Sequence, residues 1–414
     1  MNTYDVTIIG SGVAGLSVAL EFAKRGRRVL VLERNTLASG ATSRAAGLIG
    51  QMRSTPDAIH LLMDSIRVVR DIEAETGIRV LEQTGSIRVA QSRDRVNELS
   101  KDVAIALNAG LEIGMLDASD MQKMIPCMRV DDVLAASYCP SDCYLEAPTL
   151  AQAYIASGQQ HGVSYHEHAP VNSLRTANGR VVGVVAAGLD YEAPIIINAA
   201  GPWTHLVAEY AQQPLPTCGV AHYYFTTKPE ANIAIDATHP SFRDRENRIY
   251  GRPCNGGIRI GIYEALPEHI DMAKLPSDFQ MSSVTADTTK DVIRKLIAAA
   301  SDRFPSINES TPMEIRGGIM AFTPDGGPLL GELDGLKGFY HCAGFCGHGV
   351  SQSAAIGPIV ADLIEHNTCK YDLTQLAADR FADWPSLHDR ATVIQSCIDV
   401  YANYYGKPIQ SGSN

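Results

Sequence analysis

Short apolar runs alternate with amphipathic stretches at both ends of the chain. Residues 4–9 and 28–32 are apolar and rich in β-branched side chains, and residues 16–25 between them have the apolar spacing of a helix. This order predicts two buried strands joined by a helix. An apolar run, a glycine-rich turn and a helical stretch follow one another again over residues 338–365. The repeated pattern predicts an α/β fold.

The first apolar run leads directly into a glycine-rich turn with the spacing G-x-G-x-x-G. Gly10 allows a sharp turn out of the strand, Gly12 lets the backbone approach a pyrophosphate, and Gly15 lets the helix lie close to the sheet. Glu33 ends the second run, 18 residues beyond Gly15, where its carboxylate can accept hydrogen bonds from ribose hydroxyl groups. Because a carboxylate there would repel a 2′-phosphate, the turn predicts binding of FAD or NAD rather than NADP.

The rest of the chain differs from a plain NAD dehydrogenase, which would continue through alternating strands and helices. Residues 35–54 are instead rich in Gly, Ala and Ser, and such a segment can pass close to a large flat ligand. Asn178-Gly179 is a hairpin signal in the middle of the chain. The second glycine-rich turn, residues 344–349, follows the first by some 330 residues. The two turns therefore predict one discontinuous domain around an extended cofactor.

Composition and charge narrow the classes of function. The chain has 414 residues, of which 45% are hydrophobic and 20% charged, as in a soluble globular protein of two or three folding units. A net charge of −11 without a basic patch argues against a nucleic-acid partner. Nine cysteines without a CxxC pair predict reduced thiols and no metal site. No apolar stretch is long enough for a membrane span, and the N-terminus lacks the positive region of a signal peptide, so we expect a cytoplasmic protein.

Four segments together carry a specific resemblance. They are Gly10–Gly15 with Glu33, residues 199–203 (AAGPW), residues 323–326 (TPDG) and residues 344–349 (GFCGHG). In these segments the chain resembles the D-amino-acid oxidase/sarcosine oxidase superfamily of FAD-dependent oxidoreductases, from Tyr4 to about Tyr405.

Three further segments are most similar to the dimethylglycine and sarcosine dehydrogenase branch of that superfamily: residues 39–54, 222–227 (HYYFTT) and 261–264 (GIYE). Those larger dehydrogenases continue into a folate-binding domain, and this chain stops about where that domain would begin. We therefore expect no coupling to folate.

The resemblance implies an α/β protein with a Rossmann-like FAD-binding domain and an α+β substrate domain built on a mainly antiparallel sheet. We expect the FAD domain to consist of residues 1–82, 145–213 and 316–390. The substrate domain then takes residues 83–144 and 214–315, and residues 391–414 form a C-terminal helix and tail. Residues 271–287 are polar and without a clear apolar period, which predicts a surface loop or lid.

The expected cofactor-binding residues come from the two glycine-rich turns, the segment after Glu33 and the loops near the middle strands. They are Gly10, Gly12, Val13, Ala14, Gly15, Glu33, Arg34, Thr42, Ser43, Arg44, Gly47, Leu48, Val171, Gly201, Trp203, Gly344, Gly347, His348, Gly349, Val350 and Ser351. The helix that begins near Gly349 is expected to aim its N–H groups at the redox ring, where its dipole favours negative charge.

The chain departs from the family pattern at four positions. Arg44 stands where dimethylglycine dehydrogenases have a histidine bonded covalently to FAD, and Gly318 where monomeric sarcosine oxidases use a cysteine for that bond. We therefore expect FAD to be bound non-covalently. Arg259 replaces a lysine associated with oxygen activation, and Ser351 replaces a lysine that binds the substrate carboxylate.

The resemblance implies oxidation of a secondary or tertiary amine, such as an N-alkyl or imino amino acid. A hydride passes to flavin N5, and the resulting imine hydrolyses. The electron acceptor, oxygen or another molecule, and any partner subunits stay open. Other possibilities are a flavin subunit of a heteromeric amine or opine oxidase, a relative that oxidises 2-hydroxy acids or D-amino acids, and a regulatory subunit without turnover.

Candidate substrate-binding residues follow from the chemistry of the substrate. A carboxylate needs a cationic partner, and Arg can bind both of its oxygens, so Arg53, Arg252 and Arg316 are candidates. His222, Tyr224, Tyr250 and Tyr263 fall on predicted strands of the substrate domain, where alternation can direct side chains into a cavity. The sequence identifies no general base.

Overall fold

The computed structural model describes residues 2–228, 235–284, 290–308, 311–372 and 374–404. Its first sheet has six strands in the order β20-β21-β13-β1-β2-β9. The strands are β1 (Val6–Ile9), β2 (Val29–Leu32), β9 (Ser164–His166), β13 (Ile195–Asn198), β20 (Leu329–Glu332) and β21 (Phe339–Ala343). All neighbours in this sheet are parallel except β20, which pairs antiparallel with β21. Both apolar runs at the two ends of the chain are thus strands of one sheet, and the predicted α/β fold is confirmed.

Apolar side chains cover both faces of this sheet. On one face Ile8 packs with Val18 of α1 (Val13–Lys24) and Ile356 of α8 (Gly349–His366). On the other face Ile9 packs against a three-stranded antiparallel sheet. That sheet consists of β10 (Val171–Ala177), β11 (Arg180–Ala186) and β12 (Leu189–Glu192), and β10 and β11 form the hairpin predicted at Asn178-Gly179.

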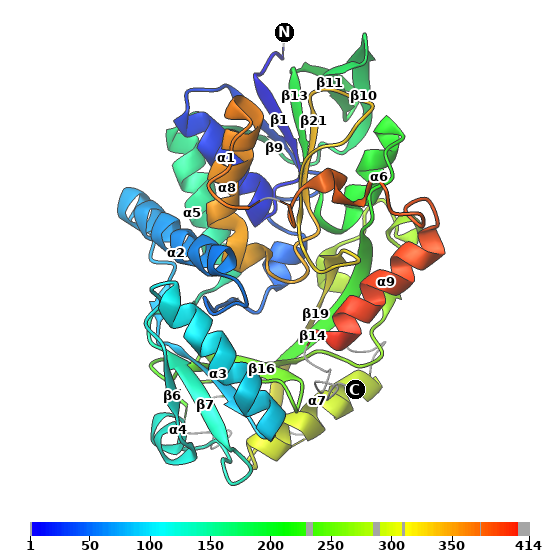
Figure 1. The fold of residues 1–414 in the computed structure, drawn as a ribbon. Helices are drawn as coiled ribbons and strands as arrows, with labels where there is room; N and C mark the ends of the chain where they lie inside the picture. Colours follow the sequence, from blue (N-terminus) through cyan, green and yellow to red (C-terminus); the bar gives the residue numbers. More distant parts are fainter. Residues whose placement is uncertain (1, 229–234, 285–289, 309–310, 373, 405–414) are drawn as a thin grey trace.

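The helices α1 and α8 cross at close range (Figure 1). A Cβ atom on Gly357 of α8 would lie 2.6 Å from the backbone oxygen of Ser17 in α1, so only glycine permits this approach. Since α1 follows β1 and α8 follows β21, and these strands run in the same direction, both helices begin at the same edge of the sheet. The two glycine-rich turns therefore lie at one edge.

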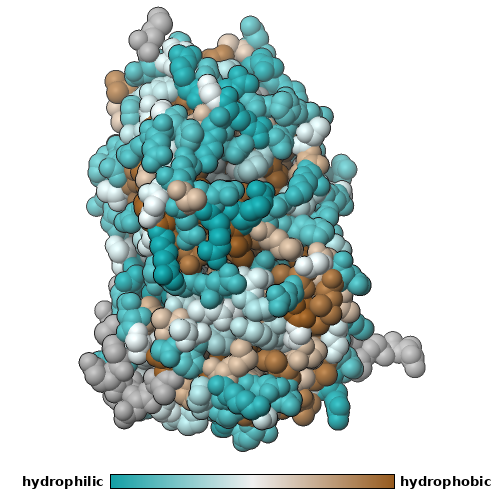
Figure 2. Space-filling view, turned by 90° about the vertical axis from the view of Figure 1, so that its left-hand side faces the viewer, coloured by the Kyte–Doolittle hydropathy of each residue, from teal (hydrophilic) through white to brown (hydrophobic). Residues whose placement is uncertain are grey.

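Two further helices, α2 (Pro56–Thr76) and α5 (Ala147–Gln160), pack beside α1 and α8. One face of α2 is buried and carries Ile59, Leu62 and Val69. Gly77 ends the helix in the left-handed conformation, at φ 71°. In the space-filling view of this side, hydrophilic side chains cover most of the surface and apolar atoms show between them (Figure 2). The exposed faces of these helices are thus polar.

The second sheet has nine strands and lies below the first in Figure 1. The strands are β5 (Ser86–Ala90), β6 (Gly114–Leu116), β7 (Ala135–Cys139), β14 (Cys218–Thr227), β15 (Ser241–Asp244), β16 (Ile249–Cys254), β17 (Gly257–Ile262), β18 (His269–Ile270) and β19 (Pro312–Phe322). Their order is β18-β14-β17-β16-β15-β5-β7-β6, with β19 paired to β14, and only the pair of β15 and β5 is parallel. The mainly antiparallel sheet expected from the resemblance is confirmed.

The strand β19 crosses one of the expected domain boundaries. We expect the last part of the FAD domain to begin at residue 316, and residues 316–322 form the second part of β19, where they pair with residues 218–224 of β14. The strand is long because it reaches from the nine-stranded sheet up to the edge of the six-stranded sheet. The nine-stranded sheet therefore includes residues up to 322.

The remaining elements cover the second sheet or connect the two. They are α3 (Arg93–Asn108), α4 (Ala118–Met124), α6 (Thr204–Ala208), α7 (Lys290–Arg303), α9 (Arg390–Asn403) and a small sheet of β3 (Leu48–Ile49), β4 (Glu82–Gln83) and β8 (Cys143–Tyr144). The predicted loop at 271–287 contains two short 3-10 turns, Met272–Lys274 and Met281–Ser283, and its residues 285–287 lie outside the described part. Of the predicted C-terminal helix and tail at 391–414, residues 405–414 lie outside it too. Among the described helices, none is long and apolar enough to cross a membrane.

Candidate active site

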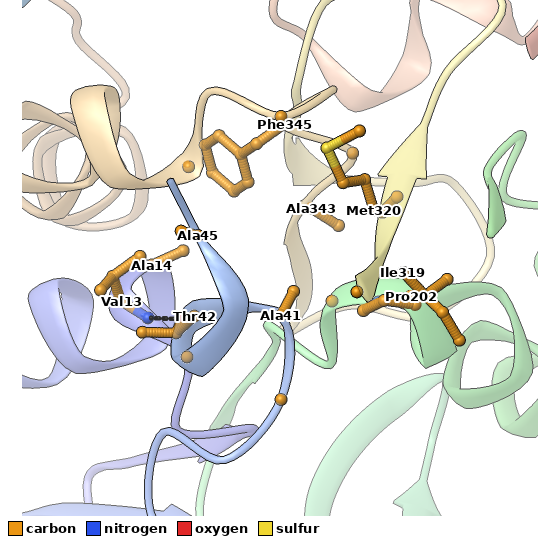
Figure 3. A pocket seen from close by; sticks show the side chains of 18 of the residues that line it. Val13, Ala14, Ala41, Thr42, Ala45, Pro202, Ile319, Met320, Ala343 and Phe345 are labelled. Carbon is orange, nitrogen blue, oxygen red and sulfur yellow. Dashed lines mark hydrogen bonds between the residues drawn. The ribbon is translucent and has the colours of Figure 1, made fainter. Parts of the chain in front are cut away.

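One cavity of about 940 Å³ joins the two glycine-rich turns. Gly10 and Gly12 line one part of it, and Gly344 and Gly347 line another. Figure 3 shows Val13, Ala14 and Thr42 on one side and Phe345 and Met320 on the other. A volume near the upper end of the roughly 300–1,000 Å³ typical of ligand sites suits a large extended molecule. The expected convergence of the two ends of the chain on one cavity is confirmed.

The first turn is shaped by close backbone contacts. A Cβ atom on Gly15 would lie 2.1 Å from the carbonyl oxygen of Gly10, so α1 can lie this close to β1 only without a side chain there. At Gly12 the nearest atom to such a Cβ is Thr42 Oγ1, at 3.4 Å. The space beside Gly12 is therefore open to a ligand. The Val13 N–H donates to Thr42 Oγ1 at 3.1 Å, which fixes the segment after β2 against the start of α1.

Glu33 is held at the end of β2 by a set of hydrogen bonds. Its Oε2 accepts from the Ser11 amide at 3.1 Å and the Ser11 hydroxyl at 2.6 Å, and its Oε1 accepts from the Asn35 amide at 2.9 Å. These donors fix the carboxylate where it lines the cavity. A carboxylate has room for further donors on the remaining lone pairs, as ribose hydroxyl groups require.

Arg34 and Trp203 close the same end of the cavity. The Arg34 guanidinium lies 4.7 Å from the centroid of the Trp203 ring and donates to the Ser277 carbonyl oxygen at 2.6 Å. This contact joins the end of β2 to residues 271–284, the described part of the segment 271–287 that was expected to be a surface loop or lid. Met272, Leu275 and Pro276 of that segment also line the cavity.

The second turn precedes α8, whose first residue is Gly349. The first N–H groups of a helix have no carbonyl partner within it and offer hydrogen bonds to a ligand. His348 stands at the N-cap and is hydrogen-bonded to the hydroxyl of Tyr404, which follows α9. Burial, together with the nearby charges of Arg53 and Arg243, lowers the pKa of His348 to about 3. The imidazole is therefore neutral at physiological pH.

A chain of four hydrogen-bonded side chains begins in the cavity wall. The Tyr250 hydroxyl is 2.6 Å from His222 Nε2, and His222 Nδ1 is 2.7 Å from the Tyr401 hydroxyl. Tyr401 in turn donates to Glu264 Oε2. Burial lowers the pKa of His222 to about 3, so its ring is neutral with one donor and one acceptor nitrogen. Because Tyr401 donates to Glu264, the Tyr401 oxygen accepts the hydrogen bond from His222 Nδ1–H. His222 Nε2 then accepts the hydrogen bond from the Tyr250 hydroxyl. In this direction Tyr250 donates to His222, and its oxygen acts as a hydrogen-bond acceptor.

Most of the predicted residues meet in this cavity. The cofactor candidates that line it are Gly10, Gly12, Val13, Ala14, Glu33, Arg34, Thr42, Arg44, Gly47, Leu48, Val171, Gly201, Trp203, Gly344, Gly347, His348, Gly349, Val350 and Ser351. The substrate candidates that line it are Arg53, His222, Tyr250 and Tyr263.

Two cofactor candidates do not line the cavity, for local reasons. Gly15 is covered by the backbone of Gly10, and the Ser43 hydroxyl turns back to donate to the carbonyl oxygens of Ser39 and Gly40.

Three substrate candidates also lie away from the cavity. Arg252, 1% exposed, forms an ion pair with Glu146 at 2.5 Å and also donates to the Ala46 carbonyl oxygen. Arg316 pairs with Glu314 at 2.5 Å, and Tyr224 is its buried cross-strand neighbour. The fold itself therefore uses these side chains, and we leave Arg252, Arg316 and Tyr224 out of the proposed site.

The sequence interpretation missed several residues of this site. Tyr401 and Tyr404 come from the C-terminal end of α9, and Arg88, Arg243 and Arg245 line the cavity from the nine-stranded sheet and the loop after β15. The apolar pattern of an amphipathic helix or a strand does not show which of its side chains will line a cavity. Strand alternation could have placed Arg88 on one face of its strand, but only the register of neighbouring strands brings it beside Arg243.

A dinucleotide turn that ends in an acid, with a second glycine-rich turn facing it across one cavity, defines a redox protein of the FAD-binding class. The family model described as FAD dependent oxidoreductase (DAO) matches residues 5–363. The chain belongs to this family of FAD-dependent oxidoreductases.

Individual relatives agree with this assignment. Dimethylglycine dehydrogenase of Rattus norvegicus is 28% identical over 389 residues, which are 92% of this chain and 45% of that protein. This chain thus spans less than half the length of that relative. Glycine oxidase of Geobacillus kaustophilus is 25% identical over 91% of this chain and 97% of its own length. The crystal structure of L-proline dehydrogenase from P. horikoshii has the same fold, with a TM-score of 0.82 at 23% identity, and covers 92% of this chain and 98% of that one.

The residues present fit FAD. The open space beside Gly12 and the N–H groups at the start of α1 suit the pyrophosphate, and Glu33 suits the adenosine ribose. The second turn has no side chain at Gly347 and Gly349, so its backbone can lie against a flat ring. Arg44 and Gly318 both line the cavity and offer no histidine or cysteine for a covalent bond.

Proposed function

We propose that this protein oxidises a secondary or tertiary amine of the N-alkyl or imino amino-acid class with non-covalently bound FAD. The observation that carries the proposal is the Tyr250–His222 hydrogen bond of 2.6 Å at the wall of the cavity that joins both glycine-rich turns. Dimethylglycine dehydrogenase and glycine oxidase, which this chain resembles, are named for amino-acid substrates.

Bound FAD would supply the acceptor for a hydride from the carbon next to the amine nitrogen, and water would hydrolyse the resulting imine. The amine must first lose its ammonium proton, because only the free lone pair of nitrogen can stabilise the developing positive charge. The Tyr250 oxygen accepts a hydrogen bond from the substrate ammonium and takes up that proton. Its own proton moves to His222 Nε2, the Nδ1 proton moves to Tyr401, and the Tyr401 proton moves to Glu264.

Glu264 is suited to receive that proton. Burial raises the pKa of its carboxyl group to about 7, near the pH at which a general base works best. Arg53 supplies a positive charge for the substrate carboxylate on the same cavity wall, near His348. These side chains bind the substrate, orient its amine and remove one proton.

Anaerobic bleaching of the flavin tests this function. The purified yellow protein is mixed without oxygen with N-methyl, cyclic, D- and opine-type amino acids and with 2-hydroxy acids. We expect bleaching by N-substituted amino acids. Bleaching by 2-hydroxy acids alone would contradict the proposal, and so would a colourless protein that takes up no FAD. Repeating the active substrates in air, with detection of peroxide, distinguishes oxygen from another electron acceptor.

The variant Tyr250→Phe tests the role of the hydroxyl. Loss of a general base lowers kcat/KM by roughly 10²–10⁴-fold. Because only the protonated amine needs the base, the deficit should shrink as the pH approaches the pKa of the substrate amine. A deficit that is the same at every pH would assign Tyr250 to packing instead.

A further inference from the structure

A polar segment of the second sheet's half of the chain crosses the cavity near Glu33. Residues 272–281, here called the cover segment, follow β18. The members of this segment that line the cavity are Met272, Ala273, Leu275, Pro276, Ser277 and Met281. Arg34 and Asn35, which come directly after Glu33, both donate hydrogen bonds to it. The cover segment therefore lies over the end of the cavity that suits the adenosine part of FAD.

The two ends of the cover segment are anchored on the nine-stranded sheet. Met272 and Met281 are each 2% exposed and pack in one cluster with Ile319 of β19. The Met281 sulfur accepts a hydrogen bond from the Ile319 N–H at 3.2 Å. A Cβ atom on Gly219 of β14 would lie 2.8 Å from the Met272 sulfur, so this side chain packs directly on the strand. The two buried methionines therefore act as fixed points for the residues between them.

The middle of the cover segment is exposed and rests on residues that follow β2. Residues 276–278 are exposed to solvent. The Ser277 carbonyl oxygen accepts a hydrogen bond from the Arg34 guanidinium at 2.6 Å. The Phe279 carbonyl oxygen accepts one from Asn35 Nδ2 at 3.2 Å. Side chains of the first sheet's end thus hold the middle of the segment by its backbone.

An aromatic contact adds to these hydrogen bonds. The centroid of the Phe279 ring lies 6.3 Å from that of Trp203, and the Arg34 guanidinium lies 4.7 Å from the Trp203 ring. Trp203 and Arg34 line the cavity, whereas Phe279 is half-buried and is not among the lining residues. Phe279 therefore holds the cover segment in place without forming part of the cavity wall.

These contacts define a closed form that can open. They join protein groups to one another, so they hold the segment whether or not FAD is bound. The net contribution of a partly exposed hydrogen bond or aromatic pair is modest, and a segment held in this way opens far more readily than the buried core unfolds. An extended dinucleotide cannot pass beneath a segment that is fixed at both ends until the middle of that segment has moved.

We propose that the cover segment is a gate for FAD, and that its middle must lift away from Arg34 and Asn35 before the cofactor can enter or leave. The gate acts on the cofactor and not on the substrate, because it lies at the adenosine end, whereas a substrate must reach the redox ring at the second glycine-rich turn. This inference concerns cofactor exchange and does not depend on the amine oxidation proposed above.

The rates of FAD exchange in Phe279→Ala test the gate. Dissociation is measured by loading the protein with radiolabelled FAD, adding an excess of unlabelled FAD and counting the label retained on the protein. Association is measured by the loss of flavin fluorescence when apoprotein is mixed with FAD. We expect both rate constants to rise roughly two- to tenfold, the effect of losing one aromatic contact. Because Phe279 stabilises the closed form with and without FAD, the dissociation constant should change by less than about twofold.

Two further variants control for other effects of the substitution. Leu266→Ala, in the loop before β18, removes an apolar side chain that is 87% exposed and should leave both rate constants unchanged. Phe279→Leu keeps part of the packing and should raise both rate constants by a smaller factor than Phe279→Ala. Unchanged exchange rates in Phe279→Ala would overturn the inference. Faster dissociation with unchanged association would overturn it too, because that result is typical of a residue that only strengthens FAD binding.

Steady-state kinetics distinguish this gate from a lid over the substrate. At saturating FAD, Phe279→Ala should keep the KM of any substrate that bleaches the flavin. A raised KM with unchanged FAD exchange would place the segment over the substrate and overturn the inference. If no amine bleaches the flavin, the proposed function fails, whereas the rates of FAD exchange need no substrate and still test the gate.

Discussion

Gly318 of β19 lies directly against the side chain of Arg44. A Cβ atom on Gly318 would be 2.9 Å from Arg44 Cβ and 3.5 Å from its Cγ, and Arg44 Nε donates to the Gly317 carbonyl oxygen at 2.8 Å. These are the two positions at which, by resemblance, related enzymes carry a histidine or a cysteine bonded to the flavin. In this chain the Arg44 side chain lies against the place where a side chain at position 318 would begin, and neither Arg44 nor Gly318 is a nucleophile.

The first prediction concerns the attachment of the cofactor. Because Arg44 and Gly318 cannot form a covalent bond to the flavin, acid precipitation should release all the yellow colour into the supernatant. The absorbance of supernatant and washed pellet measures the two fractions. Flavin fluorescence on the denatured polypeptide in a gel would show a covalent bond elsewhere and contradict the prediction.

The second prediction separates two glycines of the first turn. Alanine at position 15 would place its Cβ 2.1 Å from the Gly10 carbonyl oxygen, so α1 must move away from the sheet. We expect Gly15→Ala to destabilise the protein by about 1–3 kcal/mol, the usual cost of overpacking, and to weaken FAD binding. Urea unfolding without added FAD measures this loss.

Gly12→Ala is the matched substitution. Its Cβ meets only Thr42 Oγ1 at 3.4 Å, and φ −65° with ψ 167° suits alanine, so unfolding should change by less than about 0.5 kcal/mol. The methyl group occupies the space proposed for the pyrophosphate, so FAD affinity should fall about tenfold or more, which is at least about 1.4 kcal/mol. Normal FAD affinity in Gly12→Ala would place the pyrophosphate elsewhere.

Much of the fold could be predicted because its signals are local. The strand, the glycine spacing and the terminal acid Glu33 are contiguous in sequence, and the structure brings them to the cavity as expected. The repeated pattern near Gly344 could be predicted for the same reason.

The substrate side could not be predicted, because its geometry depends on register between distant strands. Arg252 and Arg88 look alike in sequence, yet Glu146 neutralises the first, whereas the second faces the cavity. Tyr401 reaches His222 from a helix 179 residues farther along the chain, and no local pattern connects them. The expected domain boundary at residue 316 falls inside β19, which runs unbroken over residues 312–322 of the nine-stranded sheet.

The third prediction concerns a buried ion cluster whose residues do not line the cavity. Arg303 at the end of α7 is fully buried, with Asp132 at 2.7 Å and Asp244 at 2.8 Å. Arg303→Met would leave Asp244, also fully buried, without its cation and should cost about 3–5 kcal/mol of unfolding free energy. Arg129→Met, which breaks an exposed ion pair with Asp131, should cost about 0–1 kcal/mol. Urea unfolding of both variants measures the difference, and equal losses would contradict the structural role of Arg303.

The fourth prediction concerns stability and pH at Glu264. Its pKa is raised from 4.5 to about 7, first by burial and also by Glu268, while Tyr401 and Arg248 act in the opposite direction. Folded protein therefore binds the proton more tightly than unfolded protein. Stability should fall as the pH rises from about 4.5, and the loss is complete above about 7.

Glu264→Gln removes this titration while its amide oxygen still accepts from Tyr401. The unfolding free energy of the variant minus that of the natural protein should therefore rise by on the order of 2 kcal/mol from pH 5 to pH 8. Urea unfolding at the two pH values measures this change, with exposed Glu209→Gln as the control for the lost charge.

Glu264→Gln should also affect activity. This variant cannot take up the proton that Tyr250 removes, so its kcat/KM should fall about 10-fold or more. A gain in stability without that loss of activity would show that the proton leaves the cavity by a route other than His222 and Tyr401.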